Sequence, residues 1–275
     1  MVRLIALAVG LVFCAALLFG AIQPREAAAP DPIAKYHLAP REISFQHDGV
    51  LGTYNRGQLQ RGYQVYKEVC SGCHSLHRVA FRNLEEIGFS PAQVKALAKQ
   101  SEVASIDDKT GEANTRPALP SDKIPGPYAN DAAARAANNN ALPPDFSLLA
   151  KAREEGPRYI ASLVTGYHEA PKGWAVPAGL YYNPYFRSLN IAMPPPLAAD
   201  DQVTYTDGTK ATREQMAEDV SAFMTWAAEP KLEDRKRTGL GAVIFLIILT
   251  GLAYLSYQRV WADVKHPKSG TAPAE

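Results

Sequence analysis

The five residues 70–74, Cys-Ser-Gly-Cys-His, restrict what this chain can fold into more than any other segment does. Two thiols three positions apart can form thioether bonds to the two vinyl groups of one porphyrin, and the adjacent imidazole can bind the iron. A chain with this motif has to fold around a large planar group. The sequence therefore predicts one covalently bound haem c, attached through Cys70 and Cys73, with His74 as an iron ligand.

Two other kinds of site use a Cys-x-x-Cys pair, a thioredoxin-like dithiol and half of a zinc site. The chain has three cysteines, and the third, Cys14, lies in an apolar segment far from the motif. The sequence contains no second Cys-x-x-Cys to complete a zinc site. A redox dithiol also has no use for a histidine directly after its second cysteine. These observations favour haem attachment.

The N-terminal segment resembles a secretory leader. Residues 4–22 are apolar, follow Arg3, and precede a segment rich in alanine and proline that ends at Pro30. We expect residues 1–29 to be a signal peptide that is removed, with a retained N-terminal anchor as the alternative. The leader lacks the arginine- and serine-rich character of an organelle transit peptide, which favours a bacterial origin.

A second apolar segment lies near the C-terminus, where residues 240–257 contain no charged side chain. This length fits a transmembrane helix better than a buried core helix, because the run has no polar face. Basic residues flank both ends, so their distribution does not decide the orientation. With an exported N-terminus, we expect a periplasmic domain over 30–237, an anchor over 238–258 and a cytoplasmic tail over 259–275.

Composition and periodicity describe the domain between these two segments. The whole chain has 29 basic and 28 acidic residues, a balance that argues against nucleic acid as a partner. Helical spacing of apolar residues predicts helices over 58–70, 90–100 and 212–229. We expect the first and last of these to cross, with Gly62 permitting close approach. The proline and glycine content of residues 115–144 predicts irregular loops rather than a sheet.

The second axial ligand of the iron is expected to be a methionine or a histidine. Met193 lies in the proline-stiffened segment 191–197, whereas Met216 and Met224 have the spacing of core residues on a helix. Met193 is therefore the predicted ligand, and His168 is its main competitor. The remaining histidines are expected to be ordinary exposed side chains: His37, His47, His77 and His266.

Four segments, in this order, resemble the cytochrome c1 family: residues 61–74, 134–145, 191–197 and 226–230. The resemblance runs from about Phe45 to the C-terminal tail. It implies a mainly α, cytochrome c-like haem domain with long loops, followed by one C-terminal transmembrane helix. It also implies that Cys70 and Cys73 hold the haem, with His74 as the proximal and Met193 as the distal iron ligand.

The same resemblance implies a haem pocket built from residues far apart in the chain. Arg153 is expected to pair with a haem propionate, although it could equally be a solvated charge. The other side chains expected to contact the haem are Asn138, Ala141, Pro143, Pro144, Tyr159, Leu163, Phe186 and Ile191.

The function implied by the resemblance is electron transfer within quinol:cytochrome c reductase, the bc1 complex, in a bacterial inner membrane. The expected donor is a Rieske iron–sulfur protein, the acceptor is a soluble cytochrome c, and cytochrome b is a further partner in a dimeric complex. The chain alone is not expected to be an enzyme. The alternatives are a haem peroxidase with an open distal site and a tethered haem c shuttle. Four acidic residues form either a docking face or a solvated loop: Glu102, Asp107, Asp108 and Glu112.

Overall fold

The computed structural model describes residues 2–23 and 33–265 of the chain, which divides into two compact units. The first unit, Met1–His37, contains helix α1 (Val2–Ile22) and the short 3₁₀ helix η1 (Ala34–Tyr36). Helix α1 is apolar apart from Arg3, with a length and composition that would allow it to cross a membrane. The predicted cleavage region near residue 29 lies outside the described residues.

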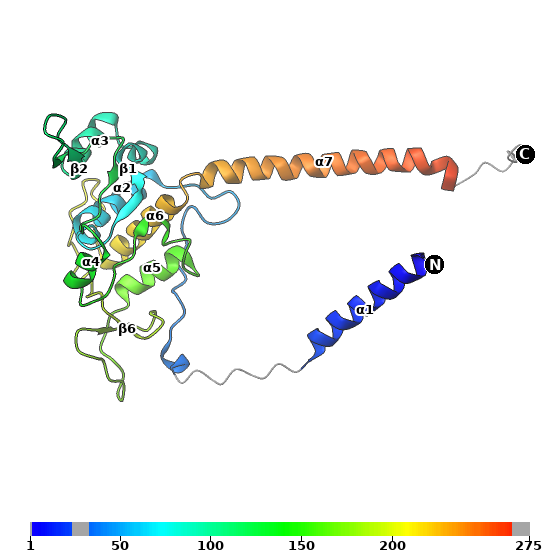
Figure 1. Ribbon diagram of the computed structural model, residues 1–275, viewed down its shortest axis with the longest axis horizontal. Coiled ribbons are helices and arrows are strands. Elements are labelled where there is room, and N and C mark those ends of the chain that lie inside the picture. Colours follow the sequence, from blue (N-terminus) through cyan, green and yellow to red (C-terminus); the bar gives the residue numbers. More distant parts are fainter. Residues whose placement is uncertain (1, 24–32, 266–275) are drawn as a thin grey trace, which may run out of the picture. The chain divides into compact units, whose positions relative to one another are not determined.

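The second unit, Leu38–Glu275, is mainly α, as expected, and is shown in Figure 1. Its strands are short and form three separate antiparallel pairs, β1 with β4, β2 with β3 and β5 with β6. The helices are α2 (Arg56–Val65), η2 (Tyr66–Cys70), η3 (Phe81–Ile87), α3 (Pro91–Ala98), α4 (Asp131–Ala137), η4 (Phe146–Leu148), α5 (Gly156–Thr165), α6 (Arg213–Ala228) and α7 (Leu232–Lys265). The strands are β1 (Leu76–Ala80), β2 (Glu102–Ile106), β3 (Ala113–Pro117), β4 (Lys123–Ile124), β5 (Tyr181–Tyr182) and β6 (Asn190–Ile191).

Helix α6 forms the centre of the domain, where it packs against both α2 and α5. Thr212 caps its start by accepting a hydrogen bond from the Gln215 amide. The predicted core residues Met216 and Met224 are fully buried. The helix is buried on more faces than its sequence pattern predicts, because α2, α5 and η4 all pack against it.

The predicted crossing of α2 and α6 is confirmed, and Gly62 is the point of contact. A Cβ atom at this position would lie 2.0 Å from the carbonyl oxygen of Asp219, so no larger residue fits without moving the helices. Beside the contact, Arg61 donates two hydrogen bonds to the fully buried carboxylate of Asp219, at 2.8 and 3.1 Å. The close approach and the ion pair together fix how the two helices cross.

The sequence predicts the start of helix α3 correctly but describes residues 115–144 only in part. Helix α3 begins as predicted, with Ser90 as its cap and Pro91 as its first residue, although it ends at Ala98. The prediction of irregular loops over 115–144 is partly wrong, since this segment contains the end of β3, the strand β4 and the helix α4. Strand β3 forms by pairing with β2, and Asn130 starts α4 by capping it, so both elements depend on contacts that composition does not report.

The acidic residues Glu102, Asp107, Asp108 and Glu112 lie on or next to the β2–β3 hairpin. The Asp107 carboxylate accepts hydrogen bonds from the backbone amides of Lys109 and Thr110, and these bonds lower its pKa. At least one of the four carboxylates therefore stabilises the hairpin turn.

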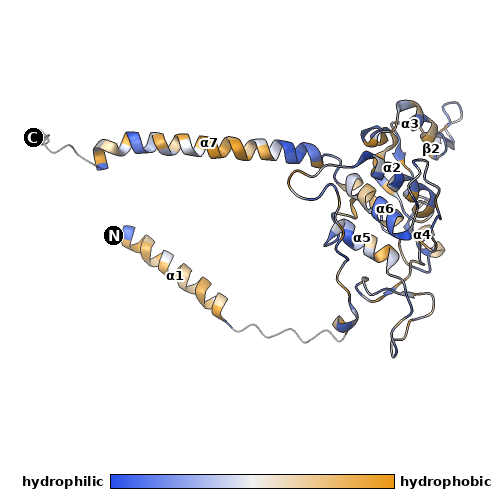
Figure 2. Cartoon of the chain, turned by 180° about the vertical axis from the view of Figure 1, so that it is seen from behind, coloured by the Kyte–Doolittle hydropathy of each residue, from blue (hydrophilic) through white to orange (hydrophobic). Residues whose placement is uncertain are grey.

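Helix α7 follows α6 after a short link and is attached to the domain by its first turns. The Glu233 carboxylate accepts a hydrogen bond from the Tyr54 amide at 2.7 Å, and the Tyr54 hydroxyl donates to the Glu229 carbonyl at 3.0 Å. The segment 232–262 is long and apolar enough to cross a membrane. In Figure 2 the middle of α7 is hydrophobic, and both of its ends are more hydrophilic. Residues beyond Lys265 lie outside the described part of the tail.

The expectation that His47 is exposed is wrong. Its side chain is buried, and its ring lies between those of Phe45 and Tyr54, with centroids 5.1 and 5.3 Å away. An ordinary surface prediction fails here because the rings of Phe45 and Tyr54 pack against the imidazole. His77 is exposed, as predicted, His37 is half-buried, and His266 lies outside the described residues.

Candidate functional site

The Cys-x-x-Cys-His motif directly follows α2, whose last turn widens before the first cysteine. Residues Tyr66–Cys70 form a π-helical turn, in which the Ser71 amide donates to the Tyr66 carbonyl at 2.8 Å. Such turns are rare and occur preferentially at functional sites. The next turn closes on Cys70, whose carbonyl accepts hydrogen bonds from the amides of Cys73 and His74 at 3.1 and 2.9 Å. Both cysteines and the histidine are thereby held in one compact turn.

The His74 ring is buried and fixed from two directions. Its Nδ1 atom lies 2.8 Å from the carbonyl oxygen of Pro144, and its ring stacks on Phe146 with centroids 4.1 Å apart. Burial lowers the pKa of His74, an effect that the Pro144 carbonyl and Asp145 oppose. With Nδ1 bound to a carbonyl, Nε2 is the nitrogen left for a metal, and it has no hydrogen bond within the described residues.

The segment that carries Pro144 is held against the motif by Asp145. Its carboxylate accepts hydrogen bonds from the Ser75 hydroxyl at 2.8 Å, the His77 amide at 2.9 Å and the Ser147 amide at 2.8 Å. Burial raises the pKa of Asp145, but these hydrogen bonds outweigh that effect and the net pKa is lowered. Sequence analysis assigned no role to Asp145 or Phe146. The sequence did contain one sign of this role, because an aspartate two residues before a serine, next to a candidate pocket segment, often accepts local backbone hydrogen bonds.

The two cysteines of the motif have free thiols, Cys70 half-buried and Cys73 exposed. Burial, with a smaller contribution from Cys73, raises the pKa of the Cys70 thiol to about 12. A dithiol oxidoreductase needs the opposite, a thiol whose pKa is lowered so that the thiolate is available. The environment of Cys70 is therefore unsuited to thiol–disulfide exchange.

The other predicted site segments are linked to one another by single hydrogen bonds. Asn139, after α4, donates from its side chain to the carbonyl of Gly179 at 3.3 Å. Asn183, after β5, donates from its side chain to the Leu163 carbonyl of α5 at 2.8 Å. These bonds bring the segment after α4, helix α5 and the segment around β5 and β6 to one region of the domain.

The candidate ligand Met193 is half-buried and lies just after β6. Its backbone carbonyl accepts a hydrogen bond of 3.0 Å from the Tyr167 hydroxyl, a contact that sequence analysis did not anticipate. Burial raises the pKa of Tyr167, so its hydroxyl is a proton donor at neutral pH. The competitor His168 is exposed, and its Nδ1 lies 3.2 Å from the carbonyl of Gly166.

The remaining predicted pocket residues fall into different environments. Asn138 ends α4, and its side-chain amide donates to the Ala134 carbonyl and the Tyr128 hydroxyl. Arg153 is exposed, and its guanidinium donates a hydrogen bond to the Ala152 carbonyl at 3.1 Å. Ile191 is buried and Pro144 exposed, and the half-buried residues are Ala141, Pro143, Tyr159, Leu163 and Phe186.

The donor set fits a haem better than a free metal ion. No group of three or more histidine, cysteine or acidic side chains that could hold an ion occurs within the described residues. One imidazole with an available Nε2 is too few ligands for a bare ion, but it suits an iron that a porphyrin already binds. Two thiols on the same turn supply the covalent attachment.

Comparison with known proteins agrees with this reading. The model of the Cytochrome C1 family matches residues 45–264. Cytochrome c1 of Rhodospirillum rubrum is 49% identical over 234 residues, which cover 79% of this chain and 86% of that protein. The cytochrome b-c1 complex catalytic subunit of Candida albicans is 45% identical over 236 residues, covering 86% of this chain and 82% of the relative.

A further relative, the cytochrome b/c1 of Bradyrhizobium diazoefficiens, is 41% identical over 283 residues, covering 94% of this chain and 40% of that longer protein. The matched residues include the Cys-x-x-Cys-His turn, the segment that fixes His74 and the apolar helix α7. Since the family model spans the site and the apolar helix alike, this chain belongs to the cytochrome c1 family.

Proposed function

We propose that this chain is the haem c subunit of a cytochrome bc1 complex, which takes electrons from a Rieske iron–sulfur protein and passes them to a soluble cytochrome c. Membership of the cytochrome c1 family supports the assignment, as do the names of the Candida and Bradyrhizobium relatives. The observation that carries it is the buried His74 ring, whose Nδ1 is bound to the Pro144 carbonyl at 2.8 Å. With Nδ1 held by this contact, Nε2 is the nitrogen that would bind the haem iron.

As a member of this family, the chain carries covalently bound haem c. When bound, the haem iron supplies the chemistry, which is one-electron oxidation and reduction. Cys70 and Cys73 would hold the haem by thioether bonds, with His74 and Met193 as axial ligands. A thioether ligand raises the reduction potential by favouring ferrous iron.

The chain's own residues orient the ligands and exclude water. Pro144 and Phe146 hold the His74 ring, and Tyr167 holds the backbone of Met193. Arg153 would pair with a haem propionate. The wall of the haem pocket would be formed by the apolar side chains of Leu163, Phe186 and Ile191, together with Ala141, Pro143, Pro144, Tyr159 and the Asn138 amide. No proton or atom is transferred by these residues, so the chain needs no general acid, base or nucleophile and is not an enzyme by itself.

We also propose that helix α7 attaches the haem domain to a membrane. Helix α7 would be the anchor over 238–258, with the haem domain over 30–237 on the periplasmic side of a bacterial inner membrane and the tail 259–275 in the cytoplasm. The apolar composition of α7 supports an anchor, and α1 within residues 1–29 has the character of an export signal. Cytochrome b would be the neighbouring membrane subunit in a dimeric complex.

Purification of the tagged chain from its native membrane tests this function. We expect cytochrome b and a Rieske protein to copurify, and quinol-dependent reduction of a soluble cytochrome c to accompany them. Recovery of the haem-loaded chain without these subunits would favour a tethered shuttle instead. Rapid turnover of hydrogen peroxide, with a distal site open to added ligands, would favour a peroxidase.

A further inference from the structure

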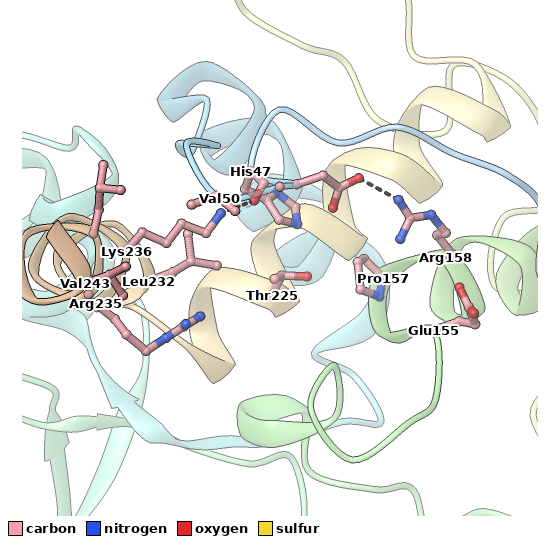
Figure 3. Close-up of a pocket in the computed structure, with 14 residues that line it drawn as sticks. His47, Val50, Glu155, Pro157, Arg158, Thr225, Leu232, Arg235, Lys236 and Val243 are labelled. Carbon is pink, nitrogen blue, oxygen red and sulfur yellow. Dashed lines mark hydrogen bonds and ion pairs between the residues drawn. The ribbon is translucent and has the colours of Figure 1, made fainter. Parts of the chain in front are cut away.

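The carboxylate of Asp145 differs from two other carboxylates of the domain in having no cationic partner. Asp219 is bound by Arg61 at 2.8 Å. Asp48 is bound by Arg158 at 2.6 Å, the ion pair that a dashed line marks at Arg158 in Figure 3. Asp145 is half-buried, and its hydrogen bonds within the described residues come from a hydroxyl and two backbone amides. This network supplies no positive charge to neutralise it.

The hydrogen bonds of Asp145 keep its carboxylate ionised. Its Oδ2 atom accepts from the Ser75 hydroxyl at 2.8 Å and from the His77 amide at 2.9 Å, while Oδ1 accepts from the Ser147 amide at 2.8 Å. Burial raises the pKa of Asp145, but these bonds outweigh burial and the net pKa is lowered. At neutral pH the side chain therefore carries a negative charge, and salt screens a partly buried charge less than an exposed one.

Both chain neighbours of Asp145 touch the proposed iron ligand. The Pro144 carbonyl oxygen lies 2.8 Å from Nδ1 of His74, and the Phe146 ring stacks on the imidazole with centroids 4.1 Å apart. Ser75, directly after His74, accepts a hydrogen bond of 2.9 Å from the Phe146 amide through its own carbonyl. The charge of Asp145 is thus one residue away from each of the two groups that hold the imidazole.

We propose that Asp145 is a positioning residue for His74, and that its uncompensated charge lowers the reduction potential of the haem. One-electron oxidation leaves the iron with one more positive charge and exchanges no proton, so a nearby anion favours the oxidised state. Asp145 would thereby offset part of the rise in potential that a Met193 thioether causes. The inference rests on the proposed ligation of the iron by His74.

A purely structural role for Asp145 predicts a different sign in one variant. The Pro144 carbonyl makes the imidazole a more basic ligand, so loosening this segment would raise the potential whichever bond is cut. The charge of Asp145, in contrast, acts more strongly when one of its hydrogen-bond donors is removed. Ser75→Ala removes such a donor and leaves the backbone bond between Ser75 and Phe146 in place. The direction of its shift separates the two roles.

Redox titration of the full, haem-loaded chain tests the charge. We expect Asp145→Asn to raise the ratio of reduced to oxidised haem about tenfold at a fixed applied potential, the usual scale on which protein surroundings shift a titration equilibrium. For one electron, this corresponds to a potential higher by about 59 mV. Ser75→Ala should lower the ratio by a smaller factor. Asp108→Asn removes an exposed charge just after β2 and should leave the ratio unchanged.

Two further variants separate the charge from the packing around it. Ser147→Ala removes the acceptor of a 3.0 Å bond from the Arg78 amide, so it loosens the same segment without changing any charge, and it should move the ratio much less than Asp145→Asn does. Asp145→Glu keeps the charge and should stay closer to the unaltered chain than Asp145→Asn. An unchanged ratio in Asp145→Asn, an equal rise in Ser147→Ala, or a rise in Ser75→Ala would overturn the proposal. If Asp145→Asn retains no haem, the direction of the Ser75→Ala shift decides alone.

Failure of this inference can be told apart from failure of the proposed function. The titration uses this chain alone, so copurification of other subunits does not enter the result. If His74→Gly keeps the low-spin spectrum of the unaltered chain, His74 is not the ligand, and the inference fails with that assignment. A spectrum that depends on His74, together with an unchanged ratio in Asp145→Asn, refutes the role of Asp145 alone.

Discussion

The hydroxyl of Tyr167 donates a hydrogen bond of 3.0 Å to the backbone carbonyl of Met193, so a residue just after α5 holds the candidate iron ligand after β6. Tyr167→Phe removes this bond and should loosen the ligand segment. We expect a weaker sulfur-to-iron absorption band and a reduction potential lower by about 40 mV, the equivalent of about 1 kcal/mol for one electron. Redox titration of the haem-loaded chain measures both.

The matched control is Tyr181→Phe, whose ring makes an edge contact with Tyr167 at 6.5 Å while its side chain is 41% exposed. It should leave the potential unchanged. Equal shifts in the two variants would mean that the loss of any tyrosine hydroxyl in this region, rather than the loss of the hydrogen bond to Met193, lowers the potential.

Substitution of Met193 itself tests the distal ligand. Met193→Leu should leave the haem covalently attached, abolish the sulfur-to-iron band and lower the potential sharply, because the ferrous-favouring thioether is lost. Met216→Leu, a buried swap of similar volume in α6, should keep the band and reduce the free energy of unfolding by less than about 1.5 kcal/mol. An unchanged potential in Met193→Leu would point to another ligand, with His168 the next to test.

Covalent attachment is tested at the motif cysteines. Cys70→Ala or Cys73→Ala should reduce the thioether bonds from two to one, which shifts the pyridine haemochrome spectrum, or should prevent maturation. Cys14→Ala, in α1, should have no effect on the spectrum. Haem that can be extracted into acidic organic solvent from the unaltered chain would contradict this prediction.

The ion pair between α2 and α6 gives a prediction for stability. Arg61→Gln leaves the fully buried carboxylate of Asp219 without its bidentate partner and should lower the free energy of unfolding by about 3–5 kcal/mol. Arg116→Gln breaks a more exposed pair with Asp122, whose charges are screened by water, and should lower the free energy of unfolding much less. Urea unfolding of both variants, followed by far-ultraviolet circular dichroism, measures the difference, and similar losses would argue against a dominant role for the buried pair.

Burial of His47 predicts a pH dependence of stability. Burial lowers the pKa of His47, Lys236 and Arg158 add to the effect, and Asp48 opposes it. The unfolded chain therefore binds this proton at higher pH than the folded chain does, so the folded state loses stability as pH falls below about 6.5. His47→Gln should reduce the stability difference between pH 7.5 and 5.5, whereas His77→Gln, at an exposed position, should not. Identical pH profiles for all three proteins would show that His47 does not titrate differently in the folded state.

The features that the sequence predicts correctly are those whose cause is local. Helices α3 and α6 have a cap residue and a periodic apolar pattern within their own segments, and α7 is identified by its uncharged run. The crossing at Gly62 was also predictable, because a glycine within an amphipathic helix marks close approach of another backbone.

The features that sequence reasoning missed depend on partners far along the chain. Asp145 bonds to residues about 70 positions away, and Tyr167 bonds to Met193 across a turn and a strand pair. No periodic pattern encodes such bonds. The identity of the distal ligand and the contacts of the haem pocket stay predictions.

The short link between α6 and α7 has a mechanical consequence. Tyr54 bonds to the end of α6 and to the start of α7, while α6 touches α2, the helix that leads into the Cys-x-x-Cys-His turn. A tilt of the proposed anchor would be transmitted through these contacts to the haem turn, because no flexible tether lies between them. The haem would then keep a fixed position relative to the anchor, and a redox partner too distant for electron transfer would have to travel to it.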